Sequence, residues 1–292
     1  MSYLIRIVDI SNPEVEFNLR RLIYEANKPL DILPEKFLLR NISSNASMAS
    51  FFLVAEKNNE FVGCNAFLAN DFILNGIQYT GYQSCWSATH PQHRGKKIFT
   101  TLINEAKGIL TENGAGFLYG IANDLSNPIF IKKLGFVEIE SQVLRIPNIP
   151  FSPDLYLNKT AFLNSAGACV IDERQVMEHK LLQYPADVKV IRFNQSWLWG
   201  KLLTKQKLGI KWPVFYVGGV CLETEKDLKE LISEIYRSYS VAFVQFFSCA
   251  TNTFIPMLKG WKKSKMNGFI FYNLNMPPPD HLNFMIGPLD IF

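Results

Sequence analysis

The sequence has little of what disulfide scaffolds, metal centres and membrane spans require. Its 292 residues include five scattered cysteines, an odd number without a C-x-x-C pair, which indicates reduced thiols in a cytosolic protein. The four histidines show no H-x-x-x-H or mixed Cys/His spacing, so we expect no metal site. No apolar run reaches the ~18 residues of a membrane helix. The N-terminal residues also lack the apolar core of a signal peptide.

The sequence also lacks a strong excess of either sign of charge. The formal net charge is +4, a small excess that does not indicate a nucleic-acid partner. With 48% hydrophobic and 19% charged residues, the composition is that of a globular protein rather than a disordered one. The length is sufficient for two domains of ordinary size.

The most informative stretch runs from residue 82 to residue 136. Tyr82–Thr89 is rich in aromatic, β-branched and small residues, which favours a strand, and His90-Pro91 ends it. Apolar residues then recur at helical spacing from Ile98 to Leu110, and Asn113-Gly114 suits a helix end. The segment between strand and helix, Gln92–Lys97, is therefore a basic turn at a helix N-terminus.

This turn is a candidate phosphate site. The first N–H groups of a helix have no partner inside it, and the helix dipole favours an anion there. Gly95 allows close approach of the backbone to a ligand, and Arg94, Lys96 and Lys97 add positive charge. The pattern is neither a Walker loop nor G-x-G-x-x-G, and a basic turn in an ordinary α/β protein is the simpler alternative.

The residues around this stretch predict a mixed α/β layout, β-α-α-β-β-β-α-β-α-β. The segment 41–49 is polar and small, and we expect either a mobile loop over a substrate cleft or only a linker. The remaining predicted elements are a strand at Tyr3–Ile10, a helix from Asn12-Pro13 to Asn27, a short helix at Pro34–Arg40, and strands at Ser50–Glu56, Glu60–Leu68, Asp71–Tyr79 and Phe117–Ile121.

The amino-acid composition changes after residue 145, where Pro147, Pro150 and Pro153 indicate a linker. We therefore expect domains at 1–145 and 159–292, joined by a linker at 146–158. For the second domain the patterns predict strands at Asp187–Phe193, Val214–Leu222, Ser240–Cys249, Gly268–Leu274 and Leu282–Ile286, and helices at Gln195–Lys205, Glu223–Tyr239 and Asn252–Lys263.

Two motifs give a family resemblance. The segment Gln92–Lys97 resembles the Q/R-x-x-G-x-G/A segment of the GNAT superfamily of acyl-CoA-dependent N-acetyltransferases, and Asn123–Phe136 resembles that family's next motif, an Asn-bearing loop and a short helix ending in K-x-G-F. The resemblance covers residues 1 to 145 and implies the GNAT fold, a mixed central sheet flanked by helices. It also implies an acyltransferase that moves an acetyl or short acyl group from acyl-CoA to an amine.

The resemblance further implies where acyl-CoA binds. The pantetheine arm would pair with the strand Tyr82–Thr89, where a bulge near residues 87–89 presents a backbone N–H to the oxyanion. Pyrophosphate would lie on the basic turn. The implied cofactor contacts are Ser87, Ala88, Thr89, Gln92, His93, Arg94, Gly95, Lys96, Lys97, Asn123 and Asn127.

Two departures from the family pattern concern charge and catalysis. Lys97 stands where the family usually has Gly or Ala, so its side chain must point away from the ligand or reach a phosphate. Ile131 stands where many members have a Tyr that protonates the leaving thiolate, so no catalytic acid is assigned. His90 and Glu60 are candidates for the general base, though each has a non-catalytic alternative.

The second half and the acceptor remain open. The element order of the second half suggests a second, degenerate GNAT-like domain. Because Glu223-Thr224-Glu225 stands where a phosphate turn would be, we expect one CoA per chain. Trp197, Trp199, Trp212 and Trp261 are either core residues or stacking surfaces for a sugar or peptide. The acceptor class suggested by the resemblance is an amino sugar or nucleotide sugar of bacterial surface-polysaccharide synthesis. The alternatives are an aminoacyl transferase acting on cell-wall precursors and a non-catalytic acyl-CoA-binding regulator.

Overall fold

The chain forms two compact units in the computed structural model. The structure describes residues 3–28, 31–42, 44, 46–148, 155–156, 168–171, 173–207, 209–249, 257–258, 264–279 and 281–283. Unit 1 comprises residues 1–72, 78–138 and 268–278, and unit 2 comprises residues 73–77, 139–267 and 279–292. No helix among these described residues is both long and apolar enough to span a membrane.

The sheet of unit 1 follows the predicted layout from its first strand to its fifth. Its strands lie in the order β1-β2-β3-β4-β5-β14, with β1–β2 and β2–β3 antiparallel and β4–β5 parallel. The strand bounds are β1 Leu4–Val8, β2 Phe51–Lys57, β3 Glu60–Leu74, β4 Ile77–Thr89, β5 Phe117–Ile121 and β14 Ser264–Asn273. The helices are α1 Pro13–Ala26, α2 Phe37–Ile42, the 3₁₀ turn η1 Pro91–His93, α3 Ile98–Glu112 and α4 Asn127–Leu134.

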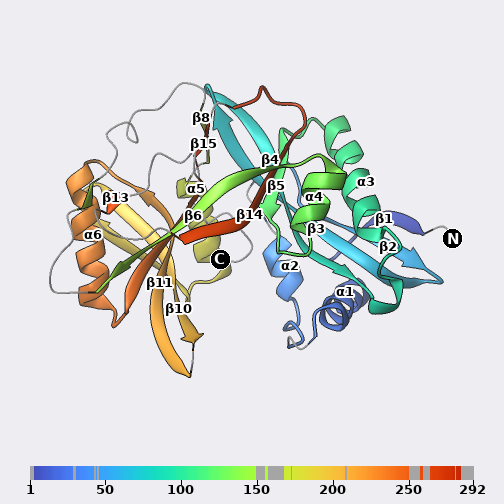
Figure 1. The fold of residues 1–292 in the computed structure, drawn as a ribbon, viewed down its shortest axis with the longest axis horizontal. Helices are drawn as coiled ribbons and strands as arrows, with labels where there is room; N and C mark the ends of the chain where they lie inside the picture. Colours follow the sequence, from blue (N-terminus) through green and yellow to red (C-terminus); the bar gives the residue numbers. More distant parts are fainter. Residues whose placement is uncertain are drawn as a thin grey trace. The chain divides into compact units, whose positions relative to one another are not determined.

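Helices α3 and α4 cover one face of this sheet and α1 and α2 the other (Figure 1), and an apolar cluster lies on each face. The α3 face carries Leu102, Ile103 and Ala106 of α3 and Leu134 of α4, packed on strand residues such as Phe67. The opposite α1/α2 face carries the buried residues of α1 and α2 over Phe52, Val54 and Ala66 among others. The mixed α/β class expected from the sequence is confirmed.

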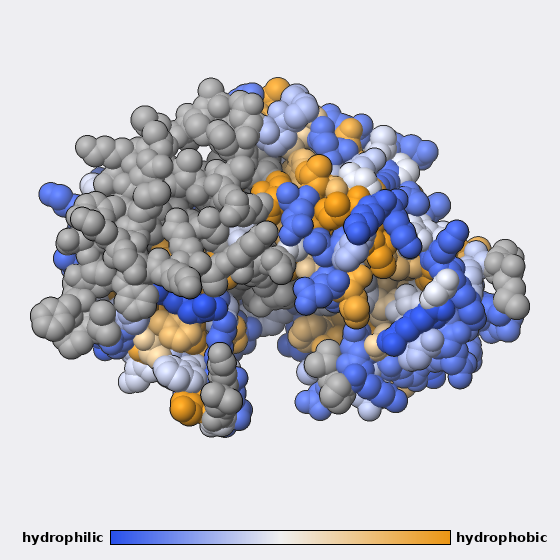
Figure 2. Space-filling view, viewed as in Figure 1, coloured by the Kyte–Doolittle hydropathy of each residue, from blue (hydrophilic) through white to orange (hydrophobic). Residues whose placement is uncertain are grey.

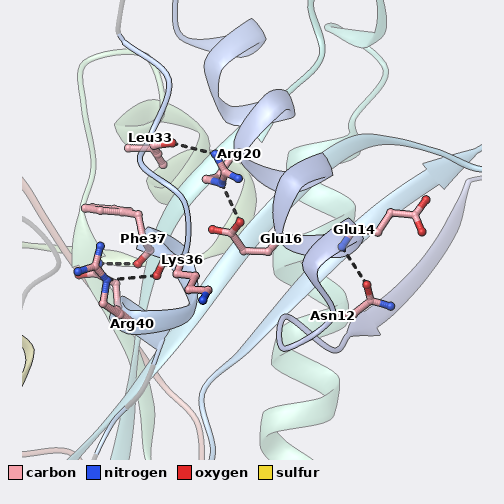
Figure 3. A network of polar contacts seen from close by, with 9 residues as sticks. Asn12, Glu14, Glu16, Arg20, Leu33, Lys36, Phe37 and Arg40 are labelled. Atoms are coloured by element: carbon pink, nitrogen blue, oxygen red, sulfur yellow. Dashed lines mark hydrogen bonds and ion pairs between the residues drawn. The ribbon is translucent and has the colours of Figure 1, made fainter.

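Helix α1 begins and is held where the sequence placed its start. Asn12 Oδ1 accepts the Glu14 N–H at 2.9 Å, which caps the helix before Pro13. Figure 3 shows how the helix contacts the segment that follows it: Arg20 donates to Glu16 Oε2 at 2.7 Å and to the Leu33 carbonyl at 3.1 Å. These bonds fix the connection between α1 and α2.

The polar segment before β2 is anchored at its end. Asp71 Oδ2 accepts hydrogen bonds from Ser47 N and Oγ at 2.8 and 2.7 Å, and its Oδ1 accepts one from Thr80 Oγ1 at 2.7 Å. Tyr82 Oη donates to the Ala49 carbonyl at 3.0 Å. Residues 46–49 therefore pack on the β3–β4 hairpin, which favours the linker interpretation of this part of the segment.

The neighbour of β5 on its far side comes from late in the chain. Strand β14 pairs antiparallel with β5, from Phe269↔Ile121 to Asn273↔Phe117. Gly268, at φ +89°, lies so close to β5 that an added Cβ would overlap the Ala122 carbonyl. We expected Gly268–Leu274 in the second domain, whereas the structure groups residues 268–278 with unit 1.

Unit 2 contains a sheet in the order β6-β12-β11-β10-β9. Its strands are β6 Val137–Pro147, β9 Val188–Phe193, β10 Ser196–Lys207, β11 Ile210–Cys221 and β12 Phe243–Cys249, with helices α5 Glu173–Gln183 and α6 Glu225–Ser238. Short pairs β8 (Ala168–Ile171) with β15 (His281–Asn283) and β7 (Leu155–Tyr156) with β13 (Met257–Leu258) complete the described strands. Ile146-Pro147, expected to open the linker, are the last residues of β6.

The predicted helix at Gln195–Lys205 is wrong, because this segment is β10. It pairs along its length with β11 and over Ser196–Lys201 with β9, and its two tryptophans, Trp197 and Trp199, are buried there. Aromatic and β-branched residues suit a strand with partners on both sides, and tertiary pairing decides such cases. Most of the predicted helix Asn252–Lys263, with Trp261, lies outside the described residues, while Trp212 is 42% exposed.

The element order of unit 2 repeats that of unit 1. The run β9-β10-β11-α6-β12 corresponds to β2-β3-β4-α3-β5, and β11 pairs parallel with β12 over Val214–Tyr216 as β4 does with β5. The antiparallel neighbour of β12 is β6, a strand that directly follows α4 in the sequence. In each unit, the strand that follows the helix thus pairs antiparallel with a strand from a distant part of the chain.

Candidate functional site

The two parallel strands at the centre of unit 1 diverge toward their carboxyl ends. Pairing between β4 and β5 runs from Gly81↔Phe117 to Gln83↔Tyr119. Strand β4 continues to Thr89 and β5 to Ile121, but these two strands form no further pairs with each other. The opening between them is where an extended ligand can lie against the backbone of β4.

A bulge interrupts β4 beside this opening. Trp86 has φ +44°, a left-handed conformation that a bulky residue rarely adopts. Its ring stacks on Phe52 at a centroid distance of 6.0 Å, on the α1/α2 face. The bulge that the family resemblance implied near residues 87–89 is therefore centred one residue earlier, and Ser87 follows it directly.

The turn after β4 leads into the N-terminus of α3 through two left-handed residues, Gly95 at φ +77° and Lys97 at φ +60°. The first α-helical hydrogen bond is donated by Thr101 N–H to the Lys97 carbonyl at 3.0 Å. The N–H groups of Ile98, Phe99 and Thr100 therefore have no acceptor inside the helix. Lys97 thus takes a left-handed conformation that residues other than glycine disfavour.

A cavity of about 440 Å³ lies at this helix N-terminus. It is lined by the turn, by the first turns of α3 and by α4; its lining includes Thr89, His93, Arg94, Gly95, Lys97, Asn104, Ile129 and Lys133. The view of unit 1 in Figure 2 shows hydrophobic residues among hydrophilic ones over α4 and the neighbouring α3. Apolar walls beside unpaired backbone donors suit a ligand with both apolar and anionic parts.

The cations of the turn differ in their availability. Arg94 Nη2 donates to the Ala26 carbonyl at 2.7 Å, and Lys96 Nζ donates to the Gln92 carbonyl at 2.9 Å. Lys97 and Lys133 line the cavity, and their ammonium groups make no hydrogen bond or ion pair with another described residue. These two ammonium groups are the ones best able to meet an anion in the cavity.

The expected cofactor contacts are only partly brought together. Thr89, His93, Arg94, Gly95 and Lys97 line the cavity, whereas Ser87, Ala88, Gln92 and Lys96 do not. Sequence reasoning missed Asn104 of α3 and Lys133 of α4. Lys133 lies in the K-K-L-G-F motif, and only the orientation of α4 relative to the turn could have identified this lysine as a site residue.

The two asparagines of the second motif have structural partners. Asn123 Oδ1 accepts the Leu125 and Ser126 N–H groups at 3.0 and 2.9 Å, which shapes the turn before α4. Asn127 Nδ2 donates to Glu138 Oε2 at 3.3 Å. Neither asparagine is among the residues that line the cavity, and the buried Oδ1 of Asn127 has no hydrogen-bond partner among the described residues.

The candidate bases lie in a separate polar hollow of unit 1. This hollow has a volume of about 250 Å³, and Glu60, His90, Gln92 and Glu25 are among its lining residues. His90 Nε2 is 3.3 Å from Glu25 Oε2. His93 lines both the hollow and the cavity. Partial burial, followed by nearby Lys96 and Lys57, lowers the pKa of His93, so its imidazole is neutral and able to accept a proton at pH 7.

Ile131 stands at the position where many GNAT members carry a tyrosine. Ile131 packs against the apolar cluster of the α3 face, so its position is structural. Lys107, one turn after Asn104, is sandwiched against rings: its Nζ lies 3.7 Å from the centroid of Tyr272 and 5.0 Å from that of Phe136. Burial lowers the pKa of Lys107 to about 8.

Unit 2 fills the corresponding helix N-terminus with its own carboxylate. Asp227 Oδ2 accepts Ser196 Oγ at 2.6 Å and the Thr224 N–H at 3.1 Å at the start of α6. The bond from Ser196 holds the pKa of Asp227 below its usual range. The negative charges of Asp227 and Glu223 at this helix start would repel a phosphate.

Comparison with known proteins agrees with this arrangement. Residues 26–139 match the family model of the acetyltransferase (GNAT) domain. No protein of curated function is significantly similar in sequence to the chain.

Solved structures share the fold of the whole chain at low sequence identity. A probable N-acyltransferase of Enterococcus faecalis V583 has a TM-score of 0.63 at 11% identity, covering 94% of this chain and 73% of that one. A GCN5-related N-acetyltransferase of Anabaena variabilis has a TM-score of 0.63 at 11% identity, over 93% and 73% of the chains. Eis1 of Mycobacterium abscessus has a TM-score of 0.55 at 12% identity, over 94% and 74%.

Proposed function

The chain belongs to the GNAT superfamily through the acetyltransferase domain of residues 26–139, and we propose that it transfers an acetyl or other short acyl group from acyl-CoA to the primary amine of a small molecule. One observation carries the proposal for this chain. The diverging strands β4 and β5 lead to a cavity where the free N–H groups of α3 meet Lys97 and Lys133.

The phosphate end of the donor binds at the N-terminus of α3 in this proposal. The pyrophosphate of acyl-CoA lies on the N–H groups of Ile98, Phe99 and Thr100, where the helix dipole also favours it. Lys97 and Lys133 neutralise its charge, and Gly95 lets the phosphates approach the backbone. Phe99 and Ile129 provide apolar contact to the rest of the nucleotide or pantetheine.

The acyl end then lies beside the bulge. The pantetheine arm extends along β4 in the opening next to β5, which brings the thioester to Trp86 and Ser87. A backbone N–H at the bulge donates to the carbonyl oxygen as the amine attacks, and that bond strengthens as the oxyanion develops. The amine loses its proton to a base or to water, and His90, Glu60 and the neutral His93 are the candidates.

The leaving thiolate needs no dedicated acid in this proposal. A thiol has an ordinary pKa near 8.5, so CoA can depart as the thiolate and take a proton from water. Since Ile131 cannot donate, we expect a turnover number that rises with pH until the acceptor amine is fully deprotonated, without a descending limb from a tyrosine near pH 9 to 10.

The proposal extends to the acceptor class and the place of the reaction. An amino sugar or nucleotide sugar is the first class to test, on the sequence resemblance to bacterial proteins that accompany surface-polysaccharide synthesis. The donor and the reduced cysteines support a cytoplasmic reaction; Cys64, Cys85 and Cys221 are free thiols in the structure.

Binding and turnover test the proposal separately. Acetyl-CoA at about 100 times its Kd should stabilise the folded chain by ~2.7 kcal/mol, which is a rise in Tm of roughly 4 °C for a chain of 292 residues. Release of free CoA thiol would then be followed with glucosamine, amino-sugar nucleotides and simple alkylamines as acceptors. No thermal shift at millimolar acetyl-CoA contradicts the proposal, and binding without turnover of any amine favours the non-catalytic regulator.

A further inference from the structure

A fully buried amide lies beneath the bulge of β4. The side chain of Asn65, in β3, has no exposed surface. Its Nδ2 donates to the Ala66 carbonyl at 2.8 Å and to Ser84 Oγ at 3.1 Å. Its Oδ1 accepts hydrogen bonds from Ser84 Oγ at 3.3 Å and from Ser87 Oγ. One amide thus connects two hydroxyl groups of the neighbouring strand.

The two serines lie on opposite sides of the bulge in sequence. Side chains of a regular strand alternate, so Ser84 and Ser87, three positions apart, would point to opposite faces. Both nevertheless reach Asn65. The alternation shifts at Trp86, whose φ is +44° and whose ring contacts Phe52 on the α1/α2 face. Ser84 and Ser87 can both bond to Asn65 only while β4 keeps the bulge.

The chemistry of the amide suits this connection. An asparagine offers both donors and acceptors from one planar group, whereas Leu offers neither and a carboxylate cannot donate to the Ala66 carbonyl. The surrounding α3 face is otherwise apolar. In such a setting an unmade hydrogen bond is costly, so the network strongly favours the one backbone form that satisfies it.

We propose that Asn65 is a positioning residue for acyl transfer, which holds the bulge of β4 in its reactive form through Ser84 and Ser87. The inference rests on the proposed function, since the bulge presents the N–H that stabilises the oxyanion. Asn65 itself touches no substrate in this account. It acts by fixing the backbone at Trp86, so its loss should affect turnover more than donor binding, which depends on the distant turn at α3.

The test compares three variants of the full chain. Asn65→Ala removes the network. Ser87→Ala removes only the bond beyond the bulge, and because Ser87 is exposed, this variant should fold even if the first does not. Asn70→Ala is the matched control: Asn70 lies in the same strand and its Nδ2 donates to Tyr119 Oη at 2.9 Å, away from the bulge.

Three measurements are made on each variant: amide hydrogen exchange of segment 84–89, CoA affinity by calorimetry, and kcat for acetyl-CoA with an amine that the wild type uses. Asn65→Ala should raise exchange in this segment and lower kcat, each about tenfold or more, while Kd for CoA changes less than twofold. Ser87→Ala should do the same to a smaller degree, and it should add little in the double variant with Asn65→Ala.

The outcomes separate this inference from the proposed function. An equal loss of kcat in Asn70→Ala, or unchanged exchange of segment 84–89 in both Asn65→Ala and Ser87→Ala, overturns the positioning role. Failure of the wild type to bind CoA overturns the proposed function instead. The exchange measurement then still decides whether Asn65 holds the bulge.

Discussion

A carboxylate at Gly95 is the sharpest test of the phosphate site. Gly95 has φ +77°, and no atom lies within 4 Å of where its Cβ would be. The free protein therefore accommodates the side chain of Gly95→Asp without a clash. In the complex, that side chain would occupy the space through which the phosphates approach the backbone.

The expected effect has two parts of different size. A non-glycine residue in the left-handed region costs about 1 kcal/mol of folding free energy. The negative charge acts on binding: at ~5 Å from a phosphate charge, with an effective dielectric constant of about 20, the repulsion is ~3 kcal/mol. That corresponds to roughly a hundredfold rise in the Kd for CoA.

The assay is calorimetric titration with CoA at about 0.1 M salt, together with thermal unfolding. Gly95→Ala has the same backbone strain without the charge and should bind CoA much more tightly than Gly95→Asp. Gly114→Asp has the same charge and a comparable strain, with φ +79° and open space around the Cβ, but lies just beyond the C-terminus of α3. If Gly95→Asp binds CoA within threefold of Gly95→Ala, the phosphates do not bind at this turn.

Three further predictions concern stoichiometry, the strand beside β5 and pH. Titration should saturate at one CoA per chain, because Asp227 and Glu223 place negative charge at the helix N-terminus of unit 2; saturation at two would contradict this. Gly268→Ala should lower the free energy of unfolding by ~3 kcal/mol or more, because its Cβ would overlap the Ala122 carbonyl. Gly209→Ala, at φ +80° with no atom near its Cβ, should lower it by only about 1 kcal/mol. Similar losses in both variants would show that β14 does not pack tightly on β5. The pKa of Lys107 is about 8 in the folded chain and 10.5 in the unfolded chain, so the unfolded chain binds more protons between these pH values. The wild type should therefore gain stability relative to Lys107→Met as the pH rises from 8 to 10. If the difference in unfolding free energy, measured in urea, does not change with pH, the lowered pKa is refuted.

Much of unit 1 could be predicted because its signals are local. The cap at Asn12-Pro13, the end of the β4 strand at His90-Pro91 and the helical spacing from Ile98 to Leu110 each depend on neighbours within a few residues. The glycine of the turn also has a local reason, since Gly95 is left-handed in the structure. The order of elements and the place of the phosphate turn follow from these signals.

The second half shows where local signals are insufficient. The segment at residues 195–205 has apolar residues that fit a helix as well as a strand, and pairing with β9 and β11 makes it β10. No local pattern reports such partners, because strand pairing depends on residues far away in sequence.

The sequence by itself determined that a helix begins after a basic, glycine-containing turn, because capping and backbone conformation act over a few residues. Only the tertiary structure decided that β14, rather than the strand following α4, lies beside β5. It also brought Lys133 to the turn and Asn65 beneath the bulge. Closing long loops costs little more than closing short ones, so packing and hydrogen bonding between distant segments select these neighbours.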